Sequence, residues 1–234
     1  MDFPIRINKY LAQKGFSTRT GADELIKGGL VRINGKKAVL GDRVLLGDRV
    51  EVARNEKVTK KLSYILYYKP RGVVTHSPRE GERSINDITR LPEMFPVGRL
   101  DKDSEGLIIL TNDGRVTERL LHPRFSHEKA YIVTVREKIP SYVKKVLLGG
   151  VRDGKEMLTA KKVTILDPHT LEIVLTEGKK HQIRRMLAKA RLTVESLVRI
   201  RIMGMGIGTL KSGESLALTG NTLQKFLKEI GLTT

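Results

Sequence analysis

The chain has 234 residues, of which 44 are Lys or Arg and 26 are Asp or Glu, so its formal net charge is +18. This length allows one or two domains with real cores, and so large a basic excess favours a polyanionic partner. The absence of cysteine excludes disulfides, cysteine nucleophiles and cysteine-based zinc sites. No apolar run is long enough to span a bilayer and the first residues lack a secretory leader, so we expect a soluble, cytoplasmic protein.

Residues 1–55 are predicted to form a small module that begins with two helices. Ile7, Tyr10 and Leu11 recur with helical spacing, and a glycine stands where that helix should end. A second helix is expected after a cap at Ser17 or Thr18. Together they form the helical half of the module.

A hairpin follows, because Asn34-Gly35 separates two short apolar runs. The Gly-Asp-Arg-Val sequence at Gly41 recurs at Gly47, and we interpret this short echo as one turn chemistry used twice. Residues 1–61 carry 14 basic and 7 acidic residues, so the module has its own positive charge. Such residues either contact RNA phosphates or form an ordinary solvated surface. The candidate RNA contacts on the helical half are Lys9, Lys14, Arg19 and Lys27.

A polar, charged stretch at residues 56–61 is predicted to be a linker, and residues 62–234 a second domain. Strands are expected at 62–68, 73–75, 107–110, 131–135, 163–166 and 171–175. Helices are expected after a cap at Asp113, over 182–189, and near the C-terminal end, where Gly231 should stop the last one. Without a regular strand–helix–strand rhythm, this pattern predicts an α+β fold with a mixed, mainly antiparallel sheet.

The segment from Gly98 to Gly114 places carboxylates in a glycine-bounded loop that leads directly into an apolar strand. Asp101, Asp103 and Glu105 have the spacing of the start of a calcium-binding loop, but Asn112 stands where the bidentate Glu should be. Two other interpretations remain open. The acids either shape a solvated turn, or one of them is a catalytic group held by a rigid strand.

Three segments at 98–114, 128–135 and 177–186 resemble, in order, the core motifs of RNA pseudouridine synthases. The resemblance is to the RsuA/RluB/RluF branch, which modifies ribosomal RNA, and within it to the RluF-like large-subunit group. It covers nearly the whole chain, and the N-terminal module resembles an S4-type RNA-binding domain. The resemblance implies a mixed sheet with a central RNA cleft, and an isomerisation that requires no metal or cofactor.

By this resemblance Asp101, Tyr131 and Arg184 are the catalytic residues. Asp101 would attack C1′, attack C6, or remove a sugar proton, and the sequence does not choose among these. Arg184 would pair with the Asp101 carboxylate, and Tyr131 would stack on the flipped uracil and relay the C5 proton. The remaining candidate RNA contacts are Lys69, Arg71, Arg99, Lys129, Lys179, Lys180, His181, Gln182 and Arg185.

The chain departs from the family pattern at several positions, which puts the RNA target in doubt. Tyr68 replaces the usual Asn, Arg191 replaces a Gly after the third motif, and Ser215-Leu216 replaces a Trp-Arg pair. The partner is expected to be ribosomal RNA, most simply 23S RNA of the large subunit, with no membrane and with a monomer as the acting unit. A transfer-RNA substrate and a non-catalytic RNA-binding or ribosome-assembly factor are the alternatives.

Overall fold

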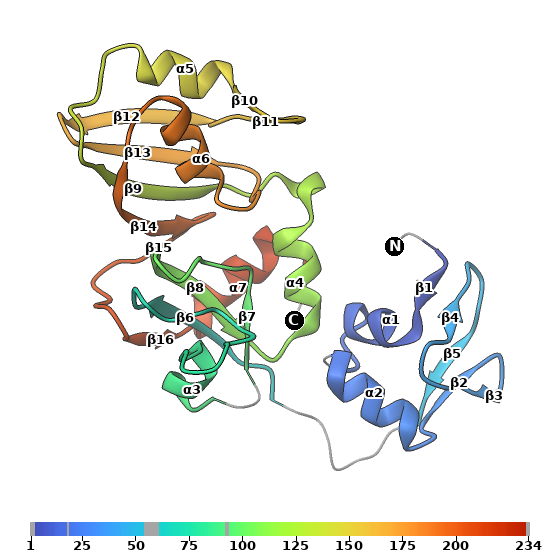
Figure 1. Cartoon of the computed structure of the whole chain (residues 1–234). Coiled ribbons are helices and arrows are strands. Elements are labelled where there is room, and N and C mark those ends of the chain that lie inside the picture. Colours follow the sequence, from blue (N-terminus) through green and yellow to red (C-terminus); the bar gives the residue numbers. More distant parts are fainter. Residues whose placement is uncertain (1–2, 18, 54–60, 92–93, 233–234) are drawn as a thin grey trace.

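The computed structural model describes residues 3–17, 19–53, 61–91 and 94–232 (Figure 1). The predicted cap at Thr18 and residues 56–60 of the predicted linker lie outside the described residues. Within the described ranges, no helix is long and apolar enough to cross a membrane.

The N-terminal module has the two predicted helices and the predicted hairpin. Asn34 and Gly35 have φ angles of 50° and 79°, as a tight two-residue turn requires. One core of aliphatic side chains, centred on Ile7, Leu11 and Val31, joins the helices to the strands. The elements are β1 (Ile5–Arg6), α1 (Ile7–Gln13), α2 (Arg19–Lys27), β2 (Val31–Ile33), β3 (Lys36–Lys37), β4 (Arg43–Val44) and β5 (Val50–Val52).

The second domain is built on a 9-stranded mixed sheet with the order β12-β13-β9-β14-β8-β6-β16, where β15 pairs with β14 and β7 with β8. This confirms the predicted α+β class. The strands are β6 (Tyr64–Lys69), β7 (Phe95–Val97), β8 (Glu105–Thr111), β9 (Lys129–Val135), β12 (Lys162–Asp167), β13 (Thr170–Leu175), β14 (Val194–Ile202), β15 (Met205–Gly206) and β16 (Ser215–Ala217).

The helices give each half of this sheet its own core. On the β12-β13-β9-β14 half, Leu147 of α5 and Met186 of α6 are fully buried, and on the other half Val116 of α4 and Phe226 of α7 are buried. Figure 1 shows α5 and α6 at one end of the sheet and α3 and α4 nearer the other. These elements are α3 (Ile85–Thr89), α4 (Gly114–Leu121), the 3-10 turn η1 (Pro123–Phe125), α5 (Val143–Gly149), the hairpin β10 (Val151–Asp153) and β11 (Glu156–Leu158), α6 (Gln182–Lys189) and α7 (Gly220–Glu229).

The two halves meet where β14 runs parallel to β8, a junction with only two paired positions. Arg199 lies opposite Gly106 at this junction, and its other neighbour, on β9, is Tyr131. Lys69 of β6 pairs with Gly106 from the opposite side. A β-carbon at Gly106, where φ is +109°, would lie 2.4 Å from the carbonyl oxygen of Arg199, so the junction requires glycine.

Helix α4 connects the N-terminal module to the sheet. A β-carbon on Gly114, at the start of α4, would lie 3.2 Å from the Cβ of Ala12, and one on Gly15 would lie 2.8 Å from Cδ of Arg115. Glycine at both positions therefore lets α1 and α4 pack closely. The C-terminal end of α4 packs against the start of the 98–104 loop, because a Cβ on Gly98 would lie 3.1 Å from the Leu121 side chain.

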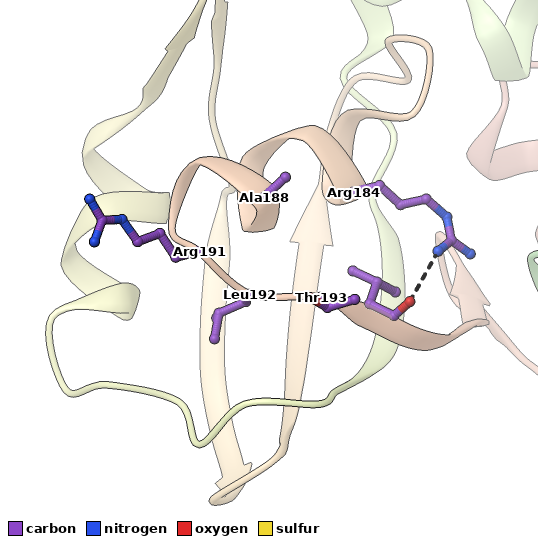
Figure 2. A pocket seen from close by; sticks show the side chains of 6 residues that line it. Arg184, Ala188, Arg191, Leu192 and Thr193 are labelled. Carbon is purple, nitrogen blue, oxygen red and sulfur yellow. Dashed lines mark hydrogen bonds between the residues drawn. The ribbon is translucent and has the colours of Figure 1, made fainter.

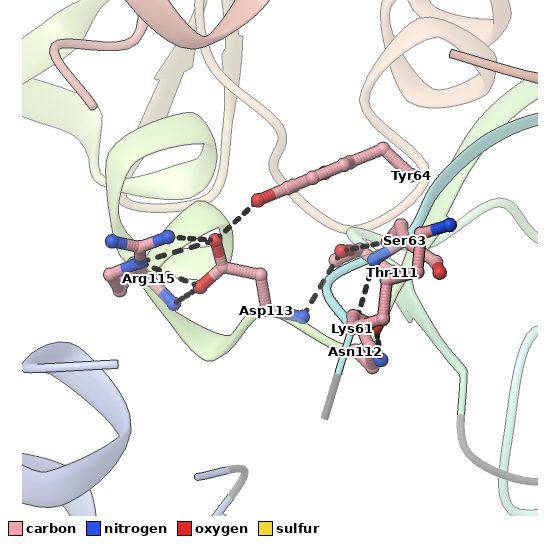
Figure 3. A network of polar contacts seen from close by, with 7 residues as sticks. All are labelled: Lys61, Ser63, Tyr64, Thr111, Asn112, Asp113 and Arg115. Carbon is pink, nitrogen blue, oxygen red and sulfur yellow. Dashed lines mark hydrogen bonds and ion pairs between the residues drawn. The ribbon is translucent and has the colours of Figure 1, made fainter. Parts of the chain in front are cut away.

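The start of α4 is fixed by the polar network in Figure 3. As predicted, Asp113 caps the helix: its carboxylate accepts the backbone N–H of Arg115 at 3.0 Å. It also accepts the Tyr64 hydroxyl at 2.8 Å, and burial together with this contact raises the pKa of Tyr64. Asn112 accepts the N–H of Ser63 and donates to the carbonyl of Lys61, so its amide holds the start of the domain.

Two expectations for secondary structure are wrong or incomplete. The predicted strand at residues 73–75 is only a single bridge between Val74 and Ser84, because the segment turns away after the Lys69-Pro70 step. The long strand β14 was not among the predicted strands, since its exposed and buried residues do not follow a clean alternation. The helix over 182–189 and the strand after the acidic loop are confirmed.

Candidate active site

A pocket of about 380 Å³ opens at the junction of the two half-sheets. It brings together all three predicted catalytic residues from three separate segments: the loop before β8, strand β9 and helix α6. A concave site with a few convergent polar groups is the usual form of a substrate pocket. Its lining consists of Arg99, Leu100, Asp101, Ser104, Tyr131, Leu175, Gly178, Lys179, Lys180, His181, Gln182, Ile183, Arg184 and Leu197.

The loop that carries Asp101 is hydrogen-bonded to the chain segment that follows β6. The buried hydroxyl of Thr75 donates to the carbonyl of Leu100 at 2.7 Å and accepts the N–H of the same residue at 3.0 Å. The N–H of Gly72 donates to the carbonyl of Lys102 at 2.8 Å. The carbonyl of Asp101 itself accepts the N–H of Ser104 at 3.1 Å, so hydrogen bonds hold the backbone on both sides of the carboxylate-bearing residue.

The imidazole of His181 lies beside the Asp101 carboxylate. Their Nε2 and Oδ1 atoms lie 3.5 Å apart, and both side chains are partly open to solvent. His181 has a left-handed backbone with φ of 52° and stands at the start of α6, and this geometry turns its side chain toward the loop. The sequence predicted an RNA contact for His181, and no motif signal pointed to its place beside Asp101.

The predicted ion pair between Arg184 and Asp101 is not formed in the part of the chain that the structure describes. The guanidinium of Arg184 instead donates to the backbone carbonyls of Asp103, at 3.0 Å, and Val194, at 3.4 Å. Figure 2 shows this side chain reaching toward Val194 at one end of a second, open hollow of about 440 Å³. Arg184 therefore ties the acidic loop to β14 and acts on Asp101 only through the backbone.

Tyr131 lies in the floor of the pocket, 8% exposed, with Arg199 directly opposite on the neighbouring strand. Opposite residues of an antiparallel pair share a sheet face, so Arg199 lies beneath the pocket. Its Nε donates to the carbonyl of Leu107 at 2.7 Å, while one terminal nitrogen has no partner among the described residues. Ser104 also has a buried, unpartnered hydroxyl in the pocket wall. Neither Arg199 nor Ser104 was predicted, because neither charge nor spacing distinguishes them in the sequence.

One predicted RNA contact, Lys69, is wrong because its side chain lies inside the protein, and a second, Lys129, is half-buried. Lys69 is 0% exposed, and its ammonium donates to the carbonyls of Pro70 and Val73 at 2.8 and 2.7 Å. Lys129 is half-buried and donates to the carbonyl of His127 at 3.2 Å. Burial lowers the pKa of Lys69 to about 8 against the opposing charges of Glu105 and Asp101. Burial, together with the charge of Arg199, lowers the pKa of Lys129 to about 8.

Three more of the side chains predicted to contact RNA form hydrogen bonds or ion pairs within the protein. Gln182 is buried, and its amide bonds the Glu177 side chain and the Thr159 carbonyl. Arg185 forms ion pairs with Asp153 and Glu156 of the β10–β11 hairpin. Lys179 donates to the carbonyl of Met157 at 2.7 Å and pairs with Glu177. Lys179 and Gln182 line the pocket, while Arg185 holds the β10–β11 hairpin through its ion pairs.

The other predicted RNA contacts are exposed, as a binding role requires. On the catalytic domain they are Arg71, Arg99 and Lys180, and on the N-terminal module they are Lys9, Lys14, Arg19 and Lys27. Their exposure is compatible with phosphate contact but does not test it. Among the described residues, no group of three or more His, Cys, Asp or Glu side chains is arranged to hold a metal ion.

The fold and site together define a nucleic-acid-modifying enzyme with a separate RNA-binding module. The pattern of the family described as RNA pseudouridylate synthase matches residues 63–189, and that of the S4 domain matches residues 5–50. The chain belongs to the RNA pseudouridylate synthase family. It is an RNA pseudouridine synthase of the RsuA/RluB/RluF type, and its substrate is RNA.

Named relatives and a crystal structure agree with this placement. The chain is 36% identical to the dual-specificity RNA pseudouridine synthase RluF of Escherichia coli strain K12, over 98% of this chain and 80% of that protein. It is 32% identical to the ribosomal large subunit pseudouridine synthase B of Bacillus subtilis strain 168, over 94% of each. A crystal structure of pseudouridylate synthase superposes with a TM-score of 0.70 and 26% identity, over 97% of this chain and 99% of that one.

Proposed function

We propose that the protein converts a specific uridine of large-subunit ribosomal RNA into pseudouridine, with Asp101 as the essential carboxylate. The observation that carries the proposal is the pocket that both Asp101, from the loop before β8, and Tyr131, from β9, line. Relatives named for the large ribosomal subunit and for dual-specificity RNA modification support the choice of substrate.

The reaction breaks the N1–C1′ bond of uridine, turns the uracil, and forms a C5–C1′ bond, while the C5 proton leaves and N1 takes up a proton. A base inside a duplex must leave its stack to reach such a pocket. Tyr131 offers an aromatic face that replaces lost stacking, an interaction of about 1–3 kcal/mol per base. In this proposal its hydroxyl receives or relays the C5 proton.

Asp101 supplies the negative charge that each candidate mechanism needs at the sugar–base junction. The His181 imidazole lies 3.5 Å from this carboxylate. Arg184 keeps the loop in place through the Asp103 carbonyl. Attack at C1′, attack at C6 and removal of a sugar proton remain equally compatible with this arrangement.

The test compares Asp101→Asn with Asp103→Asn, two equal changes of charge in one loop. Tritium release from C5-labelled uridine in a ribosomal RNA transcript should fall to background for Asp101→Asn. It should stay near the wild-type rate for Asp103→Asn, because Asp103 uses its backbone carbonyl rather than its carboxylate to hold Arg184. Substantial turnover by Asp101→Asn would refute the assignment of Asp101.

The RNA target is tested with separate transcripts of large-subunit RNA, small-subunit RNA and transfer RNA. We expect tritium release from the large-subunit transcript, and release only from transfer RNA would overturn the proposed substrate. We also propose that a monomer is the acting unit. We further propose a cytoplasmic location, where ribosomal RNA of this kind is assembled into subunits.

A further inference from the structure

The connection between α4 and β9 carries a cluster of cations and rings that the reaction does not use. We define the Phe125 cluster as Arg119, His122, Arg124, Phe125 and His127. The guanidinium carbons of Arg124 and Arg119 lie 4.6 and 5.7 Å from the centre of the Phe125 ring. The His127 ring is stacked against Phe125 at 5.7 Å, and the His122 ring meets it edge-on at 6.2 Å.

Hydrogen bonds hold the cluster in one arrangement. The Nδ1 atom of His122 accepts the N–H of Arg124 at 3.3 Å, and the ring of His127 contacts the carbonyl of Arg119 at 3.0 Å. Burial lowers the pKa of His127, which favours the neutral ring that this packing requires. These bonds fix the backbone at both arginines, and the guanidinium groups themselves contact the Phe125 ring.

Neither Arg119 nor Arg124 is held in a close ion pair among the described residues. Arg124 has a side chain that is 49% exposed, and its one carboxylate neighbour, Glu118, is 3.8 Å away and makes only a long contact. Arg119 forms no ion pair among the described residues and contacts the ring with its guanidinium. A guanidinium that is stacked on a ring keeps its N–H edges free, and those edges match the oxygens of a phosphate.

The cluster lies on the path between the RNA-binding module and the pocket. The first turn of α4 packs against Ala12 of the module, and its last residue, Leu121, abuts Gly98 at the start of the catalytic loop. Strand β9, which begins soon after Phe125, carries Tyr131 into the pocket. Figure 1 shows α4 between the module and the sheet, with the connection to β9 at its upper end.

We propose that the Phe125 cluster is a binding site for backbone phosphate of the substrate RNA, between the S4 module and the pocket. The site rests on the proposed RNA substrate but not on the role of Asp101. Stacking on Phe125 and the fixed loop order the guanidinium groups in advance, so less freedom is lost when a phosphate binds. The competing explanation is that the cluster is purely structural and only stabilises the connection between α4 and β9.

The test is the double variant Arg119→Gln/Arg124→Gln, compared with Arg136→Gln/Arg152→Gln. The control pair removes the same charge from exposed positions on β9's far end and on the β10–β11 hairpin. For a single-stranded contact, each lost phosphate lowers the slope of log K against log salt by about 0.7, so the double variant should lose about 1.4. Its KM for the ribosomal RNA transcript should rise about tenfold, while kcat at saturating RNA stays near wild type.

Phe125→Leu separates the two explanations further. It keeps both charges and an apolar side chain but removes the ring that orders the guanidinium groups, so KM should rise about threefold with the melting temperature recorded alongside. A double variant with wild-type KM and wild-type salt slope would overturn the proposal, and so would equal effects in the control pair. A wild-type protein that binds the transcript but releases no tritium would refute the proposed function. The salt slopes of the double variant and the control pair would still test the phosphate site.

Discussion

The predicted RNA-binding cations of the S4 module are exposed, whereas two cations at the sheet junction of the catalytic domain are buried. On the module, Lys9, Lys14, Arg19 and Lys27 are exposed. In the catalytic domain the most buried cations, Lys69 and Arg199, lie in one row across the sheet and satisfy backbone carbonyls. A net charge of +18 therefore overstates the charge offered to RNA, because part of it holds the pocket together.

The physical reason is the mixed sheet itself. Its parallel junction has only two paired positions, and the segment after β6 leaves the sheet at a proline, so several carbonyls lack strand partners. Lys69 and Arg199 donate to such carbonyls from within the fold, which avoids the cost of leaving them unsatisfied. Basic residues in this region are consequently structural, while those on the small module remain free.

Among these variants, Gly106→Ala should cause the largest loss in the free energy of unfolding. A β-carbon there would collide with the Arg199 backbone at 2.4 Å in a φ of +109°, so both overpacking and backbone strain oppose it. We expect a loss of about 3–5 kcal/mol in the free energy of unfolding, measured by urea denaturation. Gly81→Ala is the control, since its φ is +78° with nothing within 4 Å, and should cost about 1 kcal/mol. Equal losses in both variants would show that the junction tolerates a side chain.

Lys69→Met tests whether an interior lysine stabilises the fold. It removes two hydrogen bonds to the carbonyls of Pro70 and Val73, and the free energy of unfolding should fall by about 1–3 kcal/mol. The salt dependence of RNA binding should not change, because the ammonium never reaches the surface. Arg71→Gln, an exposed neighbour with the same loss of charge, should leave stability within about 0.5 kcal/mol. A reduced salt slope in Lys69→Met with unchanged stability would return Lys69 to the RNA-binding surface.

Much of the fold was predictable from local patterns. The hairpin turn at Asn34-Gly35, the cap at Asp113 and the helix over 182–189 depend on nearby residues, and all three are confirmed. The meeting of Asp101, Tyr131 and Arg184 in one pocket followed from the family motifs. The partners of individual side chains did not, since the Arg184 contacts and the burial of Lys69 depend on how distant strands pair.

Replacing Lys9, Lys14, Arg19 and Lys27 together with Gln should weaken RNA binding without harming the fold. If all four contact phosphates, the slope of log K against log salt should fall by about 3, and affinity in 0.15 M salt should drop about tenfold or more. The free energy of unfolding should change little, because these side chains are exposed. Filter binding at several salt concentrations provides the measurement. An unchanged slope would mean that these lysines and this arginine are only a solvated surface.

The smallest expected effect concerns Lys129, a predicted RNA contact that is half-buried. Its pKa in the folded protein is about 8, below the value of an unfolded lysine, about 10.4. Between these values the unfolded chain binds more protons than the folded one, so the free energy of unfolding rises with pH. Below pH 8 the cost of burying the charged form is fully present, and it disappears as pH approaches 10.4.

Lys129→Met should therefore reduce the rise in stability between pH 7.5 and pH 9.5, by about 1 kcal/mol after allowance for the partial exposure of the side chain. The range stops short of the ionisation of Tyr64, whose raised pKa would act in the opposite direction. Urea midpoints at the two pH values measure the effect, with Lys180→Met as an exposed control. Lys69 shares the same lowered pKa, so some rise should persist in Lys129→Met. If the rise stays at its wild-type size, Lys129 is solvated in both states and belongs with the surface cations of the module.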